Sequence, residues 1–578
     1  MERIVRLRAC MSMLAAMAVF IAAVLPFAHS MRYDLLDYDD QLYVIENAHM
    51  REGLTCTNAI WAFRSCGYAF NWHPLTWLSL MADVTLCGGE PDDAKWASRE
   101  NRIGHFMHAH NVVLHGVNCV LLFFLLMAFR RRFAAVDTDE ASELPSILFC
   151  AVCALAWALH PLRTEVVCWV AERKELLSVG WMLASLLFYE GLVGKELRGA
   201  RAWFRYGSAG MCFALALLAK PVAVTLPALL FALDWVYGGK MKIVRLIPFV
   251  ALSAAVCVLT LFAQTETMGT GATMSWVQRM QASVGGPVVY LAQTMWPRGL
   301  SAFYRLHREL DWKWLVPGVS LLLTMAGIVC AWLKSRRPAL GDCTVVIVWA
   351  YVGLMPMLGI VKAGTEEHSD RYTYWVGCGL AAALVLAWPR VKALARRIDL
   401  RLETMRACQV LGVVVCVLGV ASYLRSAVWH DTTTLFRDAL PKCWQSGVAI
   451  GIANTLQKQG GSARAEGEAI LRRTMAENPN ADICGGLAFY LASGHIHATV
   501  GGFSDTDPFG EVRYLAMRAL SADAGNLLAY EALALADARS GKWADALKNY
   551  MRAQEINPQK DYAPMLEECS RNMTREKE

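Results

Sequence analysis

Long apolar runs alternate with short charged segments along most of this chain. Most of the runs, about 13 to 24 residues each, are long enough to cross the roughly 30 Å hydrocarbon layer as helices. Strand-type alternation is absent, and backbone groups cannot stay unpaired in lipid, so closed helices are expected. The pattern predicts about eleven membrane spans: Ala9–Phe27, Phe106–Phe129, Ile147–Leu159, Leu176–Val193, Tyr206–Ala219, Val222–Val236, Ile243–Gln264, Trp314–Leu333, Thr344–Val361, Tyr372–Trp388 and Cys408–Tyr423.

Two apolar stretches depart from a simple alternation of spans and loops. The stretch from Tyr206 to Tyr237 is too long for one straight crossing, and Lys220-Pro221 divides it because proline disfavours helix in the residue before it. We therefore expect a tight hairpin there. The apolar part of Thr265–Asp311 is short and flanked by glycine and proline, which favours a re-entrant or interfacial helix.

Basic residues fall in every second loop of this arrangement. By the positive-inside rule, the N-terminus lies inside and the C-terminus outside, provided that Thr265–Asp311 does not cross. Ala28-His29-Ser30 resembles a cleavage site, so a cleaved signal peptide in place of the first span stays open. The basic clusters are Arg3/Arg6/Arg8, Arg130-Arg131-Arg132, Lys195/Arg198/Arg201/Arg205, Lys240/Lys242/Arg245, Lys334/Arg336/Arg337 and Arg390 through Arg406.

Composition supports a membrane protein, because 56% of the 578 residues are hydrophobic and only 18% are charged. The net charge of +6 comes mostly from the inner-loop clusters, which suit the anionic headgroups of membrane lipid. No Lys/Arg patch with interleaved aromatics is present, so we expect no nucleic-acid partner. Cys56 and Cys66 lie in the first outer loop, about residues 29–105, where a disulfide stays open.

The chain becomes polar and alanine-rich after Tyr423, and we place a domain boundary between residues 428 and 429. Within residues 429–578, the stretch Leu528–Gln559 predicts two amphipathic helices joined by Ser540-Gly541-Lys542. This pattern resembles a tetratricopeptide (TPR) repeat, and a weaker copy ends at Asn478-Pro479. Stacked helix pairs of this kind form a concave surface for extended peptides. A generic helical cap is the alternative.

The run Asp37-Tyr38-Asp39-Asp40 follows the first span and is the clearest candidate for chemistry. Carboxylates at a membrane surface are costly to desolvate, and one of them can take a proton from a hydroxyl acceptor. Paired carboxylates also suit a divalent metal, so metal dependence stays open, with Asp39 and Asp40 as the candidate ligands. The plain alternative is an N-cap and turn cluster where the chain leaves the bilayer.

Two further polar islands, His160–Glu175 and Glu366–Tyr374, are predicted on the same side of the membrane. Their arginines and lysines offer donors for phosphate oxygens. A charged helix start, in which neighbouring glutamates pair with the bases, is the alternative for the first island. Interfacial anchoring is the alternative for Arg371 and for Lys220 in the hairpin turn.

The segments YDDQLYV, NWHPLTWLSL, HPLRTEVVCWVAERKELLS, LAKPVAVTLP, WPRGLSAFY and HSDRYTY occur in this order. With them the chain resembles a bacterial member of the transmembrane and tetratricopeptide-repeat O-mannosyltransferase-like group. That group has the GT-C glycosyltransferase architecture and is related to the dolichyl-phosphate-mannose protein mannosyltransferases. The resemblance covers the membrane part and, with its outward repeat domain, the tail.

The resemblance implies an all-α polytopic fold, with a GT-C-like transferase domain in residues 1–428 and an outward TPR-like domain in residues 429–578. It implies a polyprenyl-phosphate-linked sugar donor and a protein Ser/Thr or glycan acceptor, which the TPR domain would help to bind. The location implied is the bacterial inner membrane, with the site on the periplasmic side. The implied residues are Asp39 and Asp40 for catalysis, Arg173, Arg371, Lys174 and Lys220 for the donor phosphate, and His73, His160, Glu165, Glu172, Asp370 and Tyr372 in support.

Three other functions compete with transfer to protein. The same chemistry on a glycan or lipid acceptor is one, and a non-catalytic scaffold that recruits partners through its repeats is another. A transporter would need charged residues in mid-span and inverted repeats. The spans are nearly free of central charge, since Asp234, the main candidate, lies near the end of its span.

Overall fold

The structure of the chain is a computed structural model. It describes residues 2–89, 93–133, 143–239, 242–270, 276–304, 311–358, 368–398, 403–443, 445–494, 507–558 and 560–575. Every regular element in these residues is a helix. The chain divides into two compact units, Met1–Asp431 and Thr432–Glu578.

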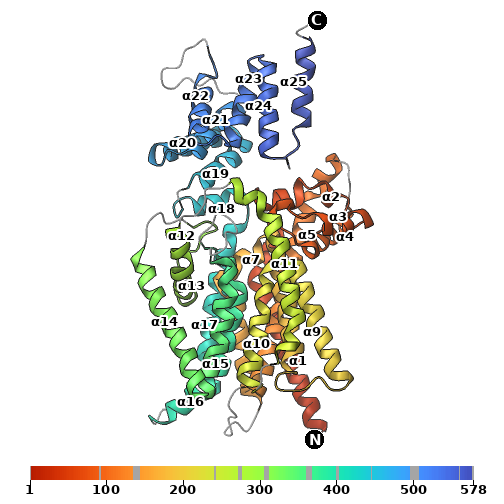
Figure 1. Cartoon of the computed structure of the whole chain (residues 1–578), viewed down its shortest axis with the longest axis vertical. Helices are drawn as coiled ribbons and strands as arrows, with labels where there is room; N and C mark the ends of the chain where they lie inside the picture. Colours follow the sequence, from red (N-terminus) through yellow and green to blue (C-terminus); the bar gives the residue numbers. More distant parts are fainter. Residues whose placement is uncertain are drawn as a thin grey trace. The chain divides into compact units, whose positions relative to one another are not determined.

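The first unit is built from long helices joined by short 3-10 and π turns (Figure 1). Its α-helices are α1 Glu2–Val24, α2 Ala48–Arg51, α3 Cys56–Arg64, α4 Pro74–Leu86, α5 Asp93–Arg132, α6 Leu144–Ala158, α7 Thr164–Cys168, α8 Arg173–Glu190, α9 Ala200–Ala219, α10 Leu226–Tyr237, α11 Ile243–Thr270, α12 Trp276–Met280, α13 Gly286–Met295, α14 Trp312–Ser335, α15 Pro338–Ile347, α16 Thr373–Arg396 and α17 Thr404–Ser426. The shorter turns are η1 Leu25–Arg32, η2 Gln41–Ile45, η3 Tyr68–Phe70, η4 Pro161–Arg163, η5 Val170–Glu172, η6 Pro221–Thr225, η7 Gln281–Gly285, η8 Val348–Val352, η9 Met355–Met357, η10 Asp370–Tyr372 and η11 Ala427–Trp429.

The predicted all-α polytopic membrane fold is confirmed. In the described ranges, eight helices are long and apolar enough to cross a membrane, and the bent pair Leu144–Ala158 and Pro161–Cys168 raises the number to nine. The count of about eleven spans stays a prediction, since these candidates are counted by length and composition alone. Two of the predicted spans fall outside this count: α8 carries three charged residues in its first turn, and Pro221–Tyr237 has fewer than 18 residues.

Helix α5 lies at the centre of the first unit, where it packs against α1, α6 and α8. Buried polar side chains tie it to its neighbours. The His115 Nδ1 lies 2.8 Å from the Tyr374 hydroxyl at the start of α16. The Asn118 Nδ2 donates to the Leu176 carbonyl of α8 at 2.9 Å. Because unpaired polar groups are costly in this core, these bonds fix the starts of α8 and α16 relative to each other.

The predicted hairpin between α9 and α10 is present. Helix α9 ends at Ala219, and Lys220 is extended (φ −157°, ψ 135°), as expected for a residue before proline. The chain before α9 meets the chain after α10, since the Lys242 Nζ donates to the Lys195 carbonyl at 2.7 Å. The two helices therefore run in opposite directions, with Lys220 at the turn.

The stretch Thr265–Asp311 is described except for residues 271–275 and 305–310. Within its described part lie the short helices α12 and α13, and no candidate spanning helix falls there. Cys56 and Cys66 are both free thiols in the structure.

The second unit consists of short helices in which sequence neighbours pack together, as α19 with α20, α21 with α22 and α23 with α24 (Figure 1). Gly541 joins α23 to α24 with a φ of +73°, which an L side chain rarely adopts. The assignment of this unit as TPR-like stays a prediction. Its helices are α18 Thr432–Ala439, α19 Ser446–Gln459, α20 Gly461–Glu477, α21 Ala481–Ser493, α22 Gly510–Ala522, α23 Leu527–Arg539, α24 Trp543–Ile556 and α25 Ala563–Arg575.

Candidate active site

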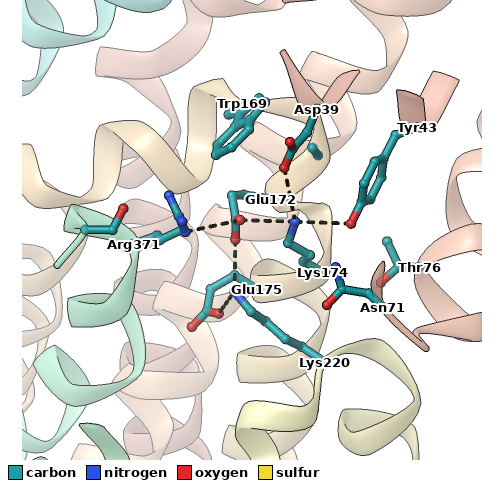
Figure 2. Close-up of polar contacts among 12 residues, drawn as sticks. Asp39, Tyr43, Asn71, Thr76, Trp169, Glu172, Lys174, Glu175, Lys220 and Arg371 are labelled. Atoms are coloured by element: carbon teal, nitrogen blue, oxygen red, sulfur yellow. Dashed lines mark hydrogen bonds and ion pairs between the residues drawn. The ribbon is translucent and has the colours of Figure 1, made fainter. Parts of the chain in front are cut away.

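Glu172 lies at the centre of a cluster of charged side chains in the first unit (Figure 2). Its Oε1 lies 3.3 Å from the Lys174 Nζ and 3.6 Å from the Arg371 Nε. Its Oε2 lies 3.1 Å from the Lys220 Nζ, which also pairs with the Glu175 Oε2 at 2.8 Å. The fold thus brings together basic residues from three distant segments that the sequence singled out.

Each of these basic side chains sits where a helix begins or ends. Lys174 lies in the first turn of α8, after the extended residue Trp169 and the short turn η5. Lys220 is held in an extended conformation by the proline that follows it. Arg371 lies in η10, directly before α16. Interruptions of the helices therefore place polar groups beside long apolar segments.

Asp39 also approaches the Lys174 ammonium, between the sides taken by Glu172 and Tyr43 (Figure 2). The Asp39 Oδ2 lies 4.0 Å from the Lys174 Nζ, and the Asp39 side chain is 41% exposed while that of Lys174 is 9% exposed. The Lys174 Nζ also donates to the Tyr43 hydroxyl at 3.3 Å and lies 5.8 Å from the centre of the Trp169 ring. Lys174 is therefore shared between two carboxylates, a phenol and an aromatic face.

Asp40 has a different environment from that of its neighbour. It is fully buried, and its Oδ1 accepts a hydrogen bond from the Ala171 backbone N–H at 2.7 Å. Its Oδ2 accepts from the Leu36 backbone N–H at 3.1 Å. These bonds hold the loop that carries Asp39 against η5, next to Glu172.

Arg371 is oriented by Glu165, which is 1% exposed. The Arg371 Nη1 lies 2.5 Å from the Glu165 Oε1, and the Arg371 backbone N–H donates to the Oε2 at 3.0 Å. The Ser369 hydroxyl donates to the same Oε1 at 3.0 Å. Glu165 therefore fixes the guanidinium so that its Nε faces Glu172.

Arg173 does not join this cluster, although it precedes Lys174 in the chain. Its fully buried guanidinium pairs with Asp83 of α4, with 2.9 Å between Nη2 and Oδ2. It also donates to the Met107 carbonyl at 2.8 Å and to the Asn111 side chain of α5. The structure thus places Arg173 on the side of α8 that faces α4 and α5.

The buried ring of His73 lies beside the cluster. Its centre is 4.6 Å from that of Trp77 and 5.4 Å from that of Tyr43. Its Nε2 makes no hydrogen bond to any part of the chain that the structure describes. Burial lowers the pKa of His73 well below its ordinary value, and Lys174 and Lys220 act in the same direction.

The remaining predicted residues are Asp370 and Tyr372, which flank Arg371 in the chain, and His160 before η4. The Tyr304 hydroxyl donates to the Asp370 carboxylate, and the His160 Nε2 donates to the Thr294 carbonyl at 3.0 Å. The Arg371 guanidinium lies 5.1 Å from the centre of the Tyr372 ring. Glu366 and Glu367, which open the third polar island, lie outside the described residues.

Electrostatics separate the carboxylates of the site. Burial alone would raise the pKa of Glu172, but Lys174, Lys220 and Arg371 outweigh it and bring the pKa to about 2. Burial raises the pKa of Asp39, and Lys174 and Arg371 offset part of that rise. Burial also raises the pKa of Asp40, to about 7, despite its two backbone hydrogen bonds. The basic residues thus favour the ionised form of Glu172, whereas the other two carboxylates hold protons more readily.

Asp39 and Asp40, the candidate ligands for a divalent cation, are both engaged by groups of the chain itself. Both Asp40 oxygens already accept backbone N–H groups, and Asp39 faces Lys174. Within the described segments, no three His, Cys, Asp or Glu side chains are placed to hold a metal ion.

Sequence reasoning missed two aromatic members of the site, Tyr43 and Trp169. Tyr43 follows Asp39 by four residues, the spacing that brings side chains to one face of a helix, so the signal was present. Trp169 gave no comparable signal, because its place against Lys174 depends on the break between α7 and η5.

Comparison with curated proteins shows a partial similarity. No family model matches the chain. A segment of 151 residues, 25% of this chain, is 28% identical to the Protein O-mannosyl-transferase Tmtc3 of Drosophila melanogaster. The chain spans only 16% of the length of that protein. The chain is therefore a polytopic helical membrane protein with a partial, distant similarity to an O-mannosyl-transferase.

Proposed function

We propose that this protein is an integral membrane glycosyltransferase. It moves a sugar, mannose-like by its partial similarity, from a polyprenyl-phosphate donor to a hydroxyl acceptor. The observation that carries the proposal is the convergence of Asp39, Lys174, Lys220 and Arg371 around Glu172 (Figure 2). A carboxylate base near a group of cations suits transfer from a phosphate leaving group.

Asp39 is the general base in this proposal. Its side chain is 41% exposed and can be approached, whereas both oxygens of the buried Asp40 are taken by backbone N–H groups. Asp39 takes the proton of the acceptor hydroxyl while the oxygen attacks the anomeric carbon opposite the phosphate. The C–O bond to the phosphate breaks, its electron pair leaves with the phosphate, and the configuration inverts. Asp40 positions the loop that carries this base.

Lys174, Lys220 and Arg371 stabilise the negative charge that grows on the departing phosphate. Their side chains are 9%, 12% and 14% exposed, so desolvation strengthens their interaction with an anion. Arg173 takes no part in the chemistry, because Asp83 and α5 already hold its guanidinium. His73, Glu165, Glu172, Asp370 and Tyr372 support the cluster, and His160 lies at its edge.

The acceptor is proposed to be a protein Ser/Thr hydroxyl, which the helix pairs of the second unit would help to select. Paired helices that stack side by side suit an extended peptide. The protein is proposed to lie in a bacterial cytoplasmic membrane, with the site and the second unit on the periplasmic side. A glycan or lipid acceptor would use the same chemistry in the first unit.

A transfer assay tests this function. The full chain in lipid nanodiscs is incubated with radiolabelled polyprenyl-phosphate sugars and a serine/threonine-rich peptide, and released polyprenyl phosphate is measured. We expect release with one donor, and a loss of about a hundredfold or more in Lys220→Met. Lys242→Met, which removes a lysine that pairs with Glu196 instead, is the matched control. A folded protein that releases no polyprenyl phosphate from any donor would leave the scaffold function as the better account.

A further inference from the structure

The cations of the site are already paired with an anion of the chain itself. Lys174, Lys220 and Arg371 come from separate segments, yet all three lie within 3.6 Å of the Glu172 carboxylate (Figure 2). Carboxylate and phosphate oxygens are recognised by the same charge-assisted hydrogen bonds. Glu172 therefore uses the interactions that a phosphate would need.

Glu172 lies deeper than the cations that surround it. Its side chain is 1% exposed, whereas those of Lys220 and Arg371 are 12% and 14% exposed. A phosphate can thus approach the cations from their exposed side while Glu172 stays behind them. Both anions then share the same positive charges at short range, where little solvent screens their repulsion.

We propose that Glu172 is a built-in counter-anion that competes with phosphate for Lys174, Lys220 and Arg371, and so weakens product binding. The inference rests on the proposed function and names the regulation of the same site. The departing phosphate monoester carries more negative charge than the phosphodiester donor. Without Glu172, the three cations would therefore hold the product more tightly than the donor. Glu172 offsets this attraction and speeds product release, a step that limits turnover in many enzymes.

A purely structural role for Glu172 predicts the opposite change in the affinity for phosphate. If this carboxylate only oriented the cations, its loss would misplace them and weaken anion binding. If it competes with phosphate, its loss strengthens anion binding, because buried cations left without a partner gain more from a new one. The sign of the change in phosphate affinity therefore separates the two roles.

The experiment measures the binding of citronellyl phosphate and of inorganic phosphate to the full chain in nanodiscs by calorimetry. For Glu172→Gln, we expect a dissociation constant for citronellyl phosphate that is at least about tenfold lower than in wild type. If the dissociation constant for inorganic phosphate falls as much, the three cations bind any phosphate. If only the dissociation constant for citronellyl phosphate falls, they bind a lipid-borne phosphate. Unchanged or weaker binding in Glu172→Gln would overturn the inference.

Two further variants complete the test. Glu175→Gln removes the same charge from a carboxylate paired with Lys220 alone among the basic residues of the cluster, so we expect a smaller gain in affinity. Glu172→Asp withdraws the carboxylate by one methylene and should fall between wild type and Glu172→Gln. Glu172→Asp also replaces Glu172→Gln in the test if the glutamine variant does not fold. Weaker phosphate binding in Glu172→Asp would equally overturn the inference.

Failure of the proposed function has a different signature. In that case, wild type and Glu172→Gln bind neither phosphate, or bind it with no loss in Lys174→Met. Wild-type binding that depends on Lys174, together with no gain in Glu172→Gln, rejects only the role given to Glu172.

Discussion

Adjacent residues of the same type have different surroundings in the candidate site. Asp39 faces Lys174, whereas the oxygens of Asp40 accept backbone N–H groups of Leu36 and Ala171. Consecutive side chains of a helix or turn point in different directions, so sequence order alone could not separate the two aspartates. The sequence could predict that acids and bases share one site, but not which member of each pair faces it.

The acidic limb of the pH–activity profile tests the base. Asp39 must be ionised to accept a proton, so activity is lost as the pH falls through its pKa, which burial raises above 3.8. Lys174 lowers this pKa, so Lys174→Met should move the acidic limb of kcat/KM to higher pH. The limb should stay in place in Lys242→Met. A limb that stays in place or moves to lower pH in Lys174→Met would exclude Asp39 as the base beside this lysine.

At the scale of elements, breaks between helices determine where the charged cluster lies. Pro221 predicted the end of α9 at Lys220 from sequence, because proline restricts the residue before it. The break at Trp169 and the pairing of Arg173 with Asp83 could not be predicted, since each involves a residue distant in sequence. Asn111 of α5 donates to the Trp169 carbonyl, and Asp83 lies in α4. The charged segment His160–Glu175 was therefore recognisable from sequence. That Arg173 and Lys174 face different sides of α8 was not.

Arg173 offers a prediction at this scale. Arg173→Met leaves the buried Asp83 without its guanidinium partner, so we expect a loss of about 3–5 kcal/mol in the free energy of unfolding. The double variant Arg173→Met with Asp83→Leu should recover part of this loss. The folded fraction of each variant should keep the wild-type KM for the donor. A raised KM at unchanged stability would instead support the role in phosphate binding that the sequence suggested for Arg173.

At the scale of the whole molecule, apolar run length predicted the fold class, and the number of spans stays a prediction. Pro221–Tyr237 has the composition of a span but fewer than 18 residues. Length could not tell which short helices lie beside longer ones within the membrane. The basic clusters still predict which loops face inward, because they follow charge and not packing.

Sidedness can be measured with single cysteines in a variant whose 18 native cysteines are replaced and whose transfer activity is retained. A cysteine at Asp34 should react with an impermeant maleimide in intact cells. A cysteine at Arg131 should react only after the membrane is opened. If both react from the same side, the proposed periplasmic position of the site loses its basis.

Single-turnover release of polyprenyl phosphate by Asp39→Asn tests the central claim most directly. The substitution keeps the shape of the side chain but removes the base, so release should fall by about a hundredfold or more while citronellyl phosphate still binds. Asp34→Asn, the same change at an exposed acid of the same loop, should release polyprenyl phosphate at the wild-type rate. Wild-type release from folded Asp39→Asn would contradict the account.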